Sequence, residues 1–245
     1  MQTFAYGDHP EQVGDLHLPS GDGPHPVVVL WHGGGYAPEY GRDMLTRAAS
    51  DLARRGFAAW NVTYRRRGSG GGWPQTFDDA RRAVEAIPGL RAPLDLEDLT
   101  ALGFSAGTPL ALHAVRSAAA AVLPRRAVNL AGITMLEAAA RAGGEESGAH
   151  RLLGDPDDHP EVYARADPLG GLPLGVPSLH VHGDADEMVP IGMTEAYLEA
   201  AREAGEDRAE LLRVPGAGHM ELAQPGTPGW EGVVRWLEAG PPARA

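Results

Sequence analysis

The stretch LTALGFSAG, residues 99–107, decides the fold. It opens as a short apolar run typical of a buried strand and closes on GFSAG, a G-x-S-x-G pentapeptide centred on Ser105. An Ala- and Leu-rich helical pattern, residues 109–121, follows at once. Together these features predict a sharp turn between a strand and a helix, with the Ser105 hydroxyl held at the carboxyl edge of a sheet.

Apolar runs alternate with helical patterns over the rest of the chain. Further strands are predicted at residues 26–31, 57–64, 127–131, 178–182 and 210–214, and helices at 43–55, 76–87, 193–204 and 230–238. Strands that alternate with helices of this length indicate βαβ units. We therefore predict an α/β fold in one domain over residues 1–245, with a mainly parallel, doubly wound sheet and helices on both faces. Residues 11–18 alternate in polarity, which predicts an antiparallel edge strand.

One segment, residues 133–177, interrupts this alternation. It begins with a helix-like stretch at 134–141 and continues as a loop rich in Gly, Asp, Pro and His. Long irregular segments inside a compact domain are usually functional or mobile. We predict a short cap insertion over the carboxyl edge of the sheet, where α/β proteins bind ligands; the alternative is a disordered surface insertion.

The composition excludes several kinds of chemistry. The 245 residues include no Cys and no Lys, so all 21 basic residues are Arg, against 33 acidic ones. Without Cys there is no thiolate nucleophile and no Cys-ligated metal site. Without Lys there is no Schiff base and no Walker A loop. A net charge of −12 argues against nucleic acid or an anionic membrane surface as a partner.

The sequence also predicts a cytoplasmic protein. Residues 1–12 have neither a basic region nor an apolar core, so no signal peptide is expected. No apolar run approaches the ~20 residues of a membrane span. Whether the protein is a monomer or a homodimer is left open by the sequence.

Two later segments supply partners for Ser105. HGDADEMVP, residues 182–190, follows a predicted strand and offers three carboxylates that could orient a histidine: Asp184, Asp186 and Glu187. PGAGHM, residues 215–220, follows the last predicted strand and carries His219. A serine hydroxyl needs an adjacent base, which His219 can be, and a carboxylate fixes the imidazole tautomer. The chain order serine, acid, histidine is that of α/β-hydrolases.

A glycine-rich loop offers an oxyanion hole. HGGG, residues 32–35, directly follows the 26–31 strand. Backbone N–H groups of Gly33 and Gly34, together with that of Ala106, could stabilise the negative oxygen of a tetrahedral intermediate. His32 is expected to order this loop structurally and not to act as an acid or base.

From about residue 11 to 238 the chain resembles an α/β-hydrolase. WHGGGY (31–36) is similar to the oxyanion motif of hormone-sensitive-lipase-like esterases and to the HGG-aromatic motif of kynurenine formamidases and bacterial feruloyl-esterase-like enzymes. WNVTYR (60–65), GGWPQTFDDA (71–80) and HGDADEMVP strengthen the second comparison. In the family pattern H-G-x-x-D-x-x-V-P the acid falls on Asp186, so the resemblance selects it over Asp184 and Glu187.

The sequence thus predicts a serine hydrolase that cleaves a small carboxylic ester, aryl or short-acyl, through an acyl-enzyme on Ser105. A formamide or amide hydrolase of the kynurenine formamidase type and a non-catalytic ligand-binding domain remain as alternatives. No metal or organic cofactor is expected; a metal cluster of His180, His182, Asp184 and Asp186 and a carboxylate-binding role for Arg65, Arg66 and Arg67 are the less favoured interpretations. Substrate-pocket residues are expected to be Trp31, Tyr36 and Met135.

Overall fold

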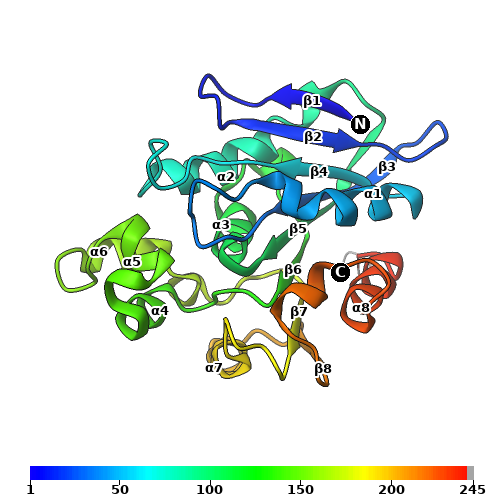
Figure 1. The fold of residues 1–245 in the computed structure, drawn as a ribbon. Helices are drawn as coiled ribbons and strands as arrows, with labels where there is room; N and C mark the ends of the chain where they lie inside the picture. Colours follow the sequence, from blue (N-terminus) through cyan, green and yellow to red (C-terminus); the bar gives the residue numbers. More distant parts are fainter. Residues whose placement is uncertain (242–245) are drawn as a thin grey trace.

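A computed structural model describes residues 1–241. Within this range eight strands form one sheet in the order β1-β2-β4-β3-β5-β6-β7-β8 (Figure 1). The strands are β1 (Gln2–Ala5), β2 (Val13–His17), β3 (His25–Trp31), β4 (Ala58–Val62), β5 (Leu94–Phe104), β6 (Arg126–Leu130), β7 (Ser178–Gly183) and β8 (Ala209–Val214). β2 is antiparallel to both of its neighbours, and the other pairs are parallel. The predicted mainly parallel α/β sheet is confirmed.

Helices cover both faces of this sheet. Those between or after the strands are α1 (Thr46–Arg54), α2 (Gln75–Glu85), α3 (Thr108–Ser117), α7 (Ile191–Glu203) and α8 (Pro228–Glu238). Successive strand residues point to opposite faces, so Val29 and Trp31 of β3 pack in the core cluster that includes α2 and α3, whereas Val28 and Leu30 pack in the cluster that includes α1 and α8. Burial on both faces explains why β3 reads as a continuous apolar run.

The register of the strands brings the motif-bearing loops together. Trp31 at the end of β3 pairs with Gly103 in β5, so the glycine loop and the turn at Ser105 begin side by side. Gly183 at the end of β7 pairs with Val214 at the end of β8, which places the two later motifs next to each other. All of these loops leave the carboxyl edge of the parallel strands, where α/β proteins place their ligands.

The structure differs from the prediction at the sheet edge and in the segment 133–177, and β5 begins at Leu94, five residues before the apolar run that starts at 99. β1 forms the edge of the sheet, so the predicted strand at residues 11–18, which corresponds to β2, is antiparallel but lies one position inside. The segment 133–177 contains three helices, of which only the first was predicted: α4 (Leu136–Gly143), α5 (Gly148–Leu153) and α6 (Pro160–Ala166). They lie together at one side of the sheet (Figure 1).

No helix among residues 1–241 has the length and apolar character needed to cross a bilayer.

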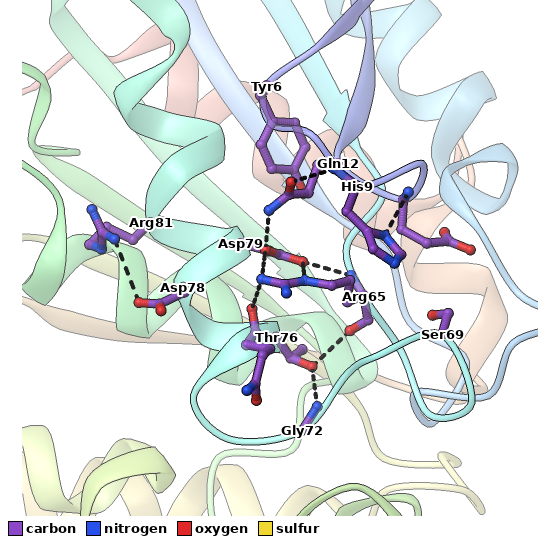
Figure 2. A network of polar contacts seen from close by, with 12 residues as sticks. Tyr6, His9, Gln12, Arg65, Ser69, Gly72, Thr76, Asp78, Asp79 and Arg81 are labelled. Atoms are coloured by element: carbon purple, nitrogen blue, oxygen red, sulfur yellow. Dashed lines mark hydrogen bonds and ion pairs between the residues drawn. The ribbon is translucent and has the colours of Figure 1, made fainter.

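A buried polar network ties the N-terminal strands to α2 (Figure 2). Asp79 on α2 is fully buried and pairs with the guanidinium of Arg65, at 2.6 Å from Nη2 to Oδ1. The same carboxylate accepts hydrogen bonds from the Arg65 backbone N–H at 2.9 Å and from Gln12 Nε2 at 2.7 Å. Arg65 is therefore neutralised inside the fold.

Replacement of Asp79 by alanine is expected to destabilise the protein by about 3 kcal/mol, because it leaves Arg65 in a largely buried position without its counter-charge. Thermal unfolding should show a melting temperature lower by roughly 6–12 °C. Asp78→Ala is the matched control: its carboxylate is substantially exposed and lies 3.6 Å from Arg81, so a change within about 0.5 kcal/mol is expected. Equal effects of the two variants would contradict this account.

Candidate active site

Ser105 sits on a strained turn between β5 and α3. Its φ is +53°, in the left-handed region that residues other than glycine seldom adopt. The turn is closed by two glycines: a Cβ atom on Gly107 would lie 2.1 Å from the carbonyl oxygen of Trp31, and one on Gly103 would lie 2.4 Å from Cα of Thr108. Only glycine fits at either position, which explains the spacing of the pentapeptide. The turn has the strand–turn–helix context that G-x-S-x-G requires.

His219 and Asp186 form a direct contact. Nδ1 of His219 lies 2.7 Å from Oδ2 of Asp186, and both side chains are almost completely buried. The other carboxylate oxygen, Oδ1, accepts the backbone N–H groups of Met188 and Val189 at 2.9 Å each. The carboxylate is therefore fixed in orientation, and it holds one nitrogen of the imidazole while leaving the other free.

Several donors keep Asp186 ionised. Burial alone would raise the pKa of this carboxyl, but hydrogen bonds from His182 and His219 and the N–H of Val189 outweigh it and hold the pKa well below its usual range. His182 is itself fixed, with Nδ1 2.8 Å from Oγ1 of Thr194 and Nε2 2.8 Å from the carbonyl oxygen of Val189. The sequence placed His182 beside Asp186 only in the less favoured metal cluster, whereas in the structure it supports the carboxylate.

The structure separates the three candidate acids. Asp184 is exposed, and its Oδ1 accepts the backbone N–H of Gly216 at 2.6 Å, so it braces the loop before His219. Glu187 is exposed to solvent. Of the three, Asp186 is the carboxylate that contacts His219.

His219 packs against Phe104, the residue before Ser105. The rings of Phe104 and His219 have their centroids 5.1 Å apart, and Ser105 is the next residue in the chain. Ser105 and His219 are 7% and 6% exposed, so each retains a small accessible surface at the same edge of the sheet. Since Nδ1 of His219 is engaged by Asp186, Nε2 is the nitrogen left to face a nucleophile.

The glycine loop after β3 lies directly against Ser105. A Cβ atom on Gly33 would come within 2.9 Å of Cβ of Ser105, so a side chain there would displace the serine. Gly34 has a φ of +97°, which lets the loop turn over the site. Gly33 therefore lies against Ser105, and Ala106 is the residue that follows the serine.

Two buried side chains hold this loop. Tyr64 donates its hydroxyl to the carbonyl oxygen of His32 at 2.7 Å, and the two rings stack with centroids 4.5 Å apart. Burial lowers the pKa of His32 to about 3, so it is neutral and acts as packing. Arg66 donates to the carbonyl oxygens of Pro38 and Tyr40 and pairs with Glu11. Neither role follows from the local sequence, because both depend on contacts between distant segments.

The segment 133–177 contacts both the serine turn and the glycine loop. The backbone N–H of Ile133 donates to the carbonyl oxygen of Ser105 at 3.2 Å. A Cβ atom on Gly148, at the start of α5, would lie 2.5 Å from the carbonyl oxygen of Gly35. Residues 133–177 therefore rest on both the serine turn and the glycine loop.

The three expected pocket residues lie in two different environments, the core and a surface hollow. Trp31 and Tyr36 have no exposed surface, so they support the glycine loop from within the core and do not line an open pocket, which corrects that expectation. Met135 is half-buried and lines a hollow of about 370 Å³ with Tyr163 and Asp167, between α4 and α6.

The residues of the less favoured interpretations, the metal cluster and the three arginines, have other roles in the structure. His180 is buried, with Nδ1 3.1 Å from Asn129 and Nε2 3.1 Å from Ser178, so its ring is held within the sheet. Over residues 1–241 no group of three His, Asp or Glu side chains is arranged to hold a metal ion. Of the three consecutive arginines, Arg65 and Arg66 are ion-paired with Asp79 and Glu11.

Comparisons with known proteins identify a family and a fold. The family model BD-FAE matches residues 15–200. No curated protein sequence matches the chain. Among solved structures, esterase 2 of Thermogutta terrifontis with propionate bound is similar at 18% identity, with 97% of this chain and 92% of that chain covered and a TM-score of 0.74.

Two further solved structures show the same likeness. The Thermogutta terrifontis enzyme phosphonylated by sarin has a TM-score of 0.76 at 19% identity, with 97% of this chain and 92% of that chain covered. A bifunctional GH43-CE protein of Bacteroides eggerthii has a TM-score of 0.76 at 23% identity, over 96% of this chain and 37% of that chain. The predicted α/β-hydrolase fold is confirmed by these likenesses.

Proposed function

This chain belongs to the BD-FAE family of esterase-like α/β-hydrolases, and we propose that it is a serine hydrolase that cleaves small carboxylic esters with an aryl or short acyl group. The observation that carries the proposal is the 2.7 Å contact between Asp186 and His219 beside the strained turn of Ser105. A family member that only binds ligands would have no need for all three groups in this arrangement.

The proposed mechanism assigns one step to each group. His219 takes the proton of the Ser105 hydroxyl as the oxygen attacks the ester carbonyl, and Asp186 stabilises the imidazolium. Backbone N–H groups of Ala106 and of Gly33 or Gly34 stabilise the oxyanion. His219 then gives the proton to the leaving alcohol, an acyl-enzyme remains on Ser105, and water activated by His219 resolves it.

Two properties of the structural neighbours support ester cleavage by an activated serine. The Thermogutta terrifontis esterase has been solved with propionate and with butyrate bound, and it is modified by sarin, tabun and paraoxon. Short acids are the acyl products that the proposal expects, and organophosphates react with an activated serine.

A parallel assay separates the ester from the formamide hypothesis. Purified protein is given p-nitrophenyl esters from acetate to decanoate and, separately, N-formylkynurenine, with Ser105→Ala as the background. We expect kcat/KM for acetate to butyrate to exceed that for decanoate and for the formamide by at least about tenfold. Preferred hydrolysis of the formamide would overturn the ester proposal, and no hydrolysis of any compound above background would overturn the hydrolase proposal itself.

A further inference from the structure

We propose that an apolar and acidic rim surrounds the mouth of the active site and selects esters whose leaving alcohol is apolar and uncharged or cationic, against those whose alcohol is anionic. The rim consists of Tyr40, Met188 and Met220 with their chain neighbours Glu39, Glu187 and Glu221. This inference rests on the proposed serine hydrolase function and deepens it by naming a substrate class.

The exposed apolar side chains of this protein gather at the catalytic loops. Tyr40 is 46% exposed, Met188 70% and Met220 46%. Among residues 1–241 only Met1 and Leu211 are further large hydrophobic side chains of comparable exposure, and they lie at the N-terminus and on the edge strand β8. Exposed apolar side chains that cluster are characteristic of binding sites, whereas scattered ones need no explanation.

Each of the three belongs to a different part of the catalytic apparatus. Tyr40 packs over the glycine loop, since a Cβ atom on Gly34 would lie 2.3 Å from Cβ of Tyr40. The backbone N–H of Met188 donates to Asp186, and Met220 directly follows His219. Asp186 and His219 are themselves in contact, so Met188 and Met220 each lie next to one member of the same hydrogen-bonded pair.

Tyr40 is held in place by its own backbone. Its carbonyl oxygen accepts a hydrogen bond from Arg66, which is almost fully buried and is also paired with Glu11. The exposed ring is therefore carried on a fixed support, and it can offer a flat apolar face to a bound aryl or alkyl group.

Every one of these apolar side chains has an exposed glutamate next to it. Glu39 precedes Tyr40, Glu187 precedes Met188, and Glu221 follows Met220. Glu221 keeps its carboxylate at the site by accepting the backbone N–H of Gly218 at 2.7 Å. The exposed Asp184 adds a fourth negative charge on the same loops.

Few cations oppose these charges. Neither 184–190 nor 215–224 contains an Arg, and Arg66 is already neutralised by Glu11. Arg47, 3.4 Å from the side-chain oxygen of Gln224, and Arg67, whose backbone N–H donates to Tyr36, are two cations on neighbouring segments, against the four carboxylates. The net field at the mouth is therefore negative, in keeping with the net charge of −12.

The consequence is a charge preference for the leaving group. Three carboxylates at a distance on the order of 10 Å in water disfavour one negative charge by about eightfold without screening and by about fivefold at ~0.01 M salt, and they favour one positive charge by similar factors. A quaternary ammonium would gain further from the exposed face of Tyr40. Both effects weaken as salt screens the exposed charges.

Three acetate esters of nearly equal shape test this preference: methyl 4-acetoxybenzoate, 4-acetoxybenzoate and 4-acetoxy-N,N,N-trimethylanilinium. Each kcat/KM is divided by the rate constant for alkaline hydrolysis of the same ester, which removes differences in leaving-group reactivity. We expect the normalised value to be about fivefold lower for the anion than for the neutral ester and to be highest for the cation. The spread between cation and anion should shrink severalfold in 0.5 M salt.

Two triple variants, each of which removes three negative charges, identify the carboxylates that cause the charge preference. In Glu39→Gln/Glu187→Gln/Glu221→Gln the spread should fall to about twofold, whereas Glu199→Gln/Glu203→Gln/Glu238→Gln, all exposed on α7 and α8, should leave it unchanged. Tyr40→Ala should lower the normalised kcat/KM for the cationic ester by a larger factor than that for the neutral ester.

The outcomes separate the two proposals. Equal normalised rates for all three esters in the wild type, or an undiminished spread in the rim variant, would overturn the rim while leaving ester hydrolysis intact. If none of the three esters is cleaved faster by the wild type than by Ser105→Ala, the hydrolase proposal fails and the rim fails with it.

Discussion

Replacement of Ser105 by alanine is expected to lower kcat for a short-chain aryl ester by about 10⁶-fold, leaving at most a residual ~10³–10⁴ over the uncatalysed reaction. The loss is large because no acyl-enzyme can form without the hydroxyl. The substitution removes nothing else from the side chain. The residue keeps its Cβ atom and its place at a φ of +53°, so the turn itself should persist. Steady-state turnover of p-nitrophenyl butyrate by purified variant measures the effect.

The fold of this variant can be checked independently. Ser20→Ala, at an exposed position in the loop before β3, is the matched control and should retain full turnover. Circular dichroism and thermal unfolding of Ser105→Ala should match the wild type within about 1 kcal/mol, as is usual for a change of one atom. Near-normal turnover in Ser105→Ala would mean that another group is the nucleophile.

Replacement of Asp186 by asparagine is the second large effect, with an expected loss in kcat of about 10⁴-fold. An amide presents an N–H₂ or a neutral oxygen to Nδ1 of His219, so it neither fixes the required tautomer nor stabilises the imidazolium. The environment of Asp186 is built for the charged form, since burial is outweighed by three donors that hold its pKa well below the usual range.

Asp184→Asn is the control for this prediction. Asp184 lies two residues away, carries the same charge and contacts Gly216 instead of His219, so its replacement should cost less than about tenfold in kcat. If Asp184→Asn were as damaging as Asp186→Asn, or if Asp186→Asn were mild, the assignment of the acid would be wrong. Initial rates of both variants with the same ester are sufficient.

The sheet could be predicted because its central strands leave a strong signal. β3 and residues 99–104 of β5 are buried, so they appear as apolar runs, whereas residues 94–98 of β5 include three acidic side chains and are only partly buried. β1 could not be predicted in the same way, because its four residues are mostly exposed and it exists only through its pairing with β2. A strand that is defined by its partner has no apolar pattern of its own.

The two later helices of the 133–177 segment were missed for a related reason. α5 and α6 have six and seven residues, and such short helices show too few turns for a reliable period. They are held by tertiary contacts, for example the hydroxyl of Tyr163 on the carbonyl oxygen of Gly154 at 2.8 Å. That this segment caps the active site remains a proposal, supported by its contacts with Ser105 and Gly35.

The candidate site was predictable where a loop must carry a specific residue. The serine turn, the glycine loop and the positions of Asp186 and His219 each follow a strand end, and parallel strands bring their carboxyl ends to one edge. Trp31 was assigned to the pocket only because it precedes the glycine loop. The alternation of strand residues already places it with Val29, on the face covered by α2 and α3.

The supporting side chains required the folded structure. Tyr64 and Arg66 lie far in the sequence from the groups that they hold, His32 and Glu11. Such side chains decide how firmly the loops are positioned, and the contact between two segments is not encoded in either segment alone.

The most direct test of the account is to label the protein with a fluorophosphonate and to locate the adduct by mass spectrometry of peptides. The account predicts one equivalent of label on Ser105, no label in Ser105→Ala, and labelling at least about 10³-fold slower in His219→Ala, because the base that activates the hydroxyl is gone. An adduct on a different residue, or a wild-type protein that takes up no label, would contradict the claim that Ser105 is an activated nucleophile.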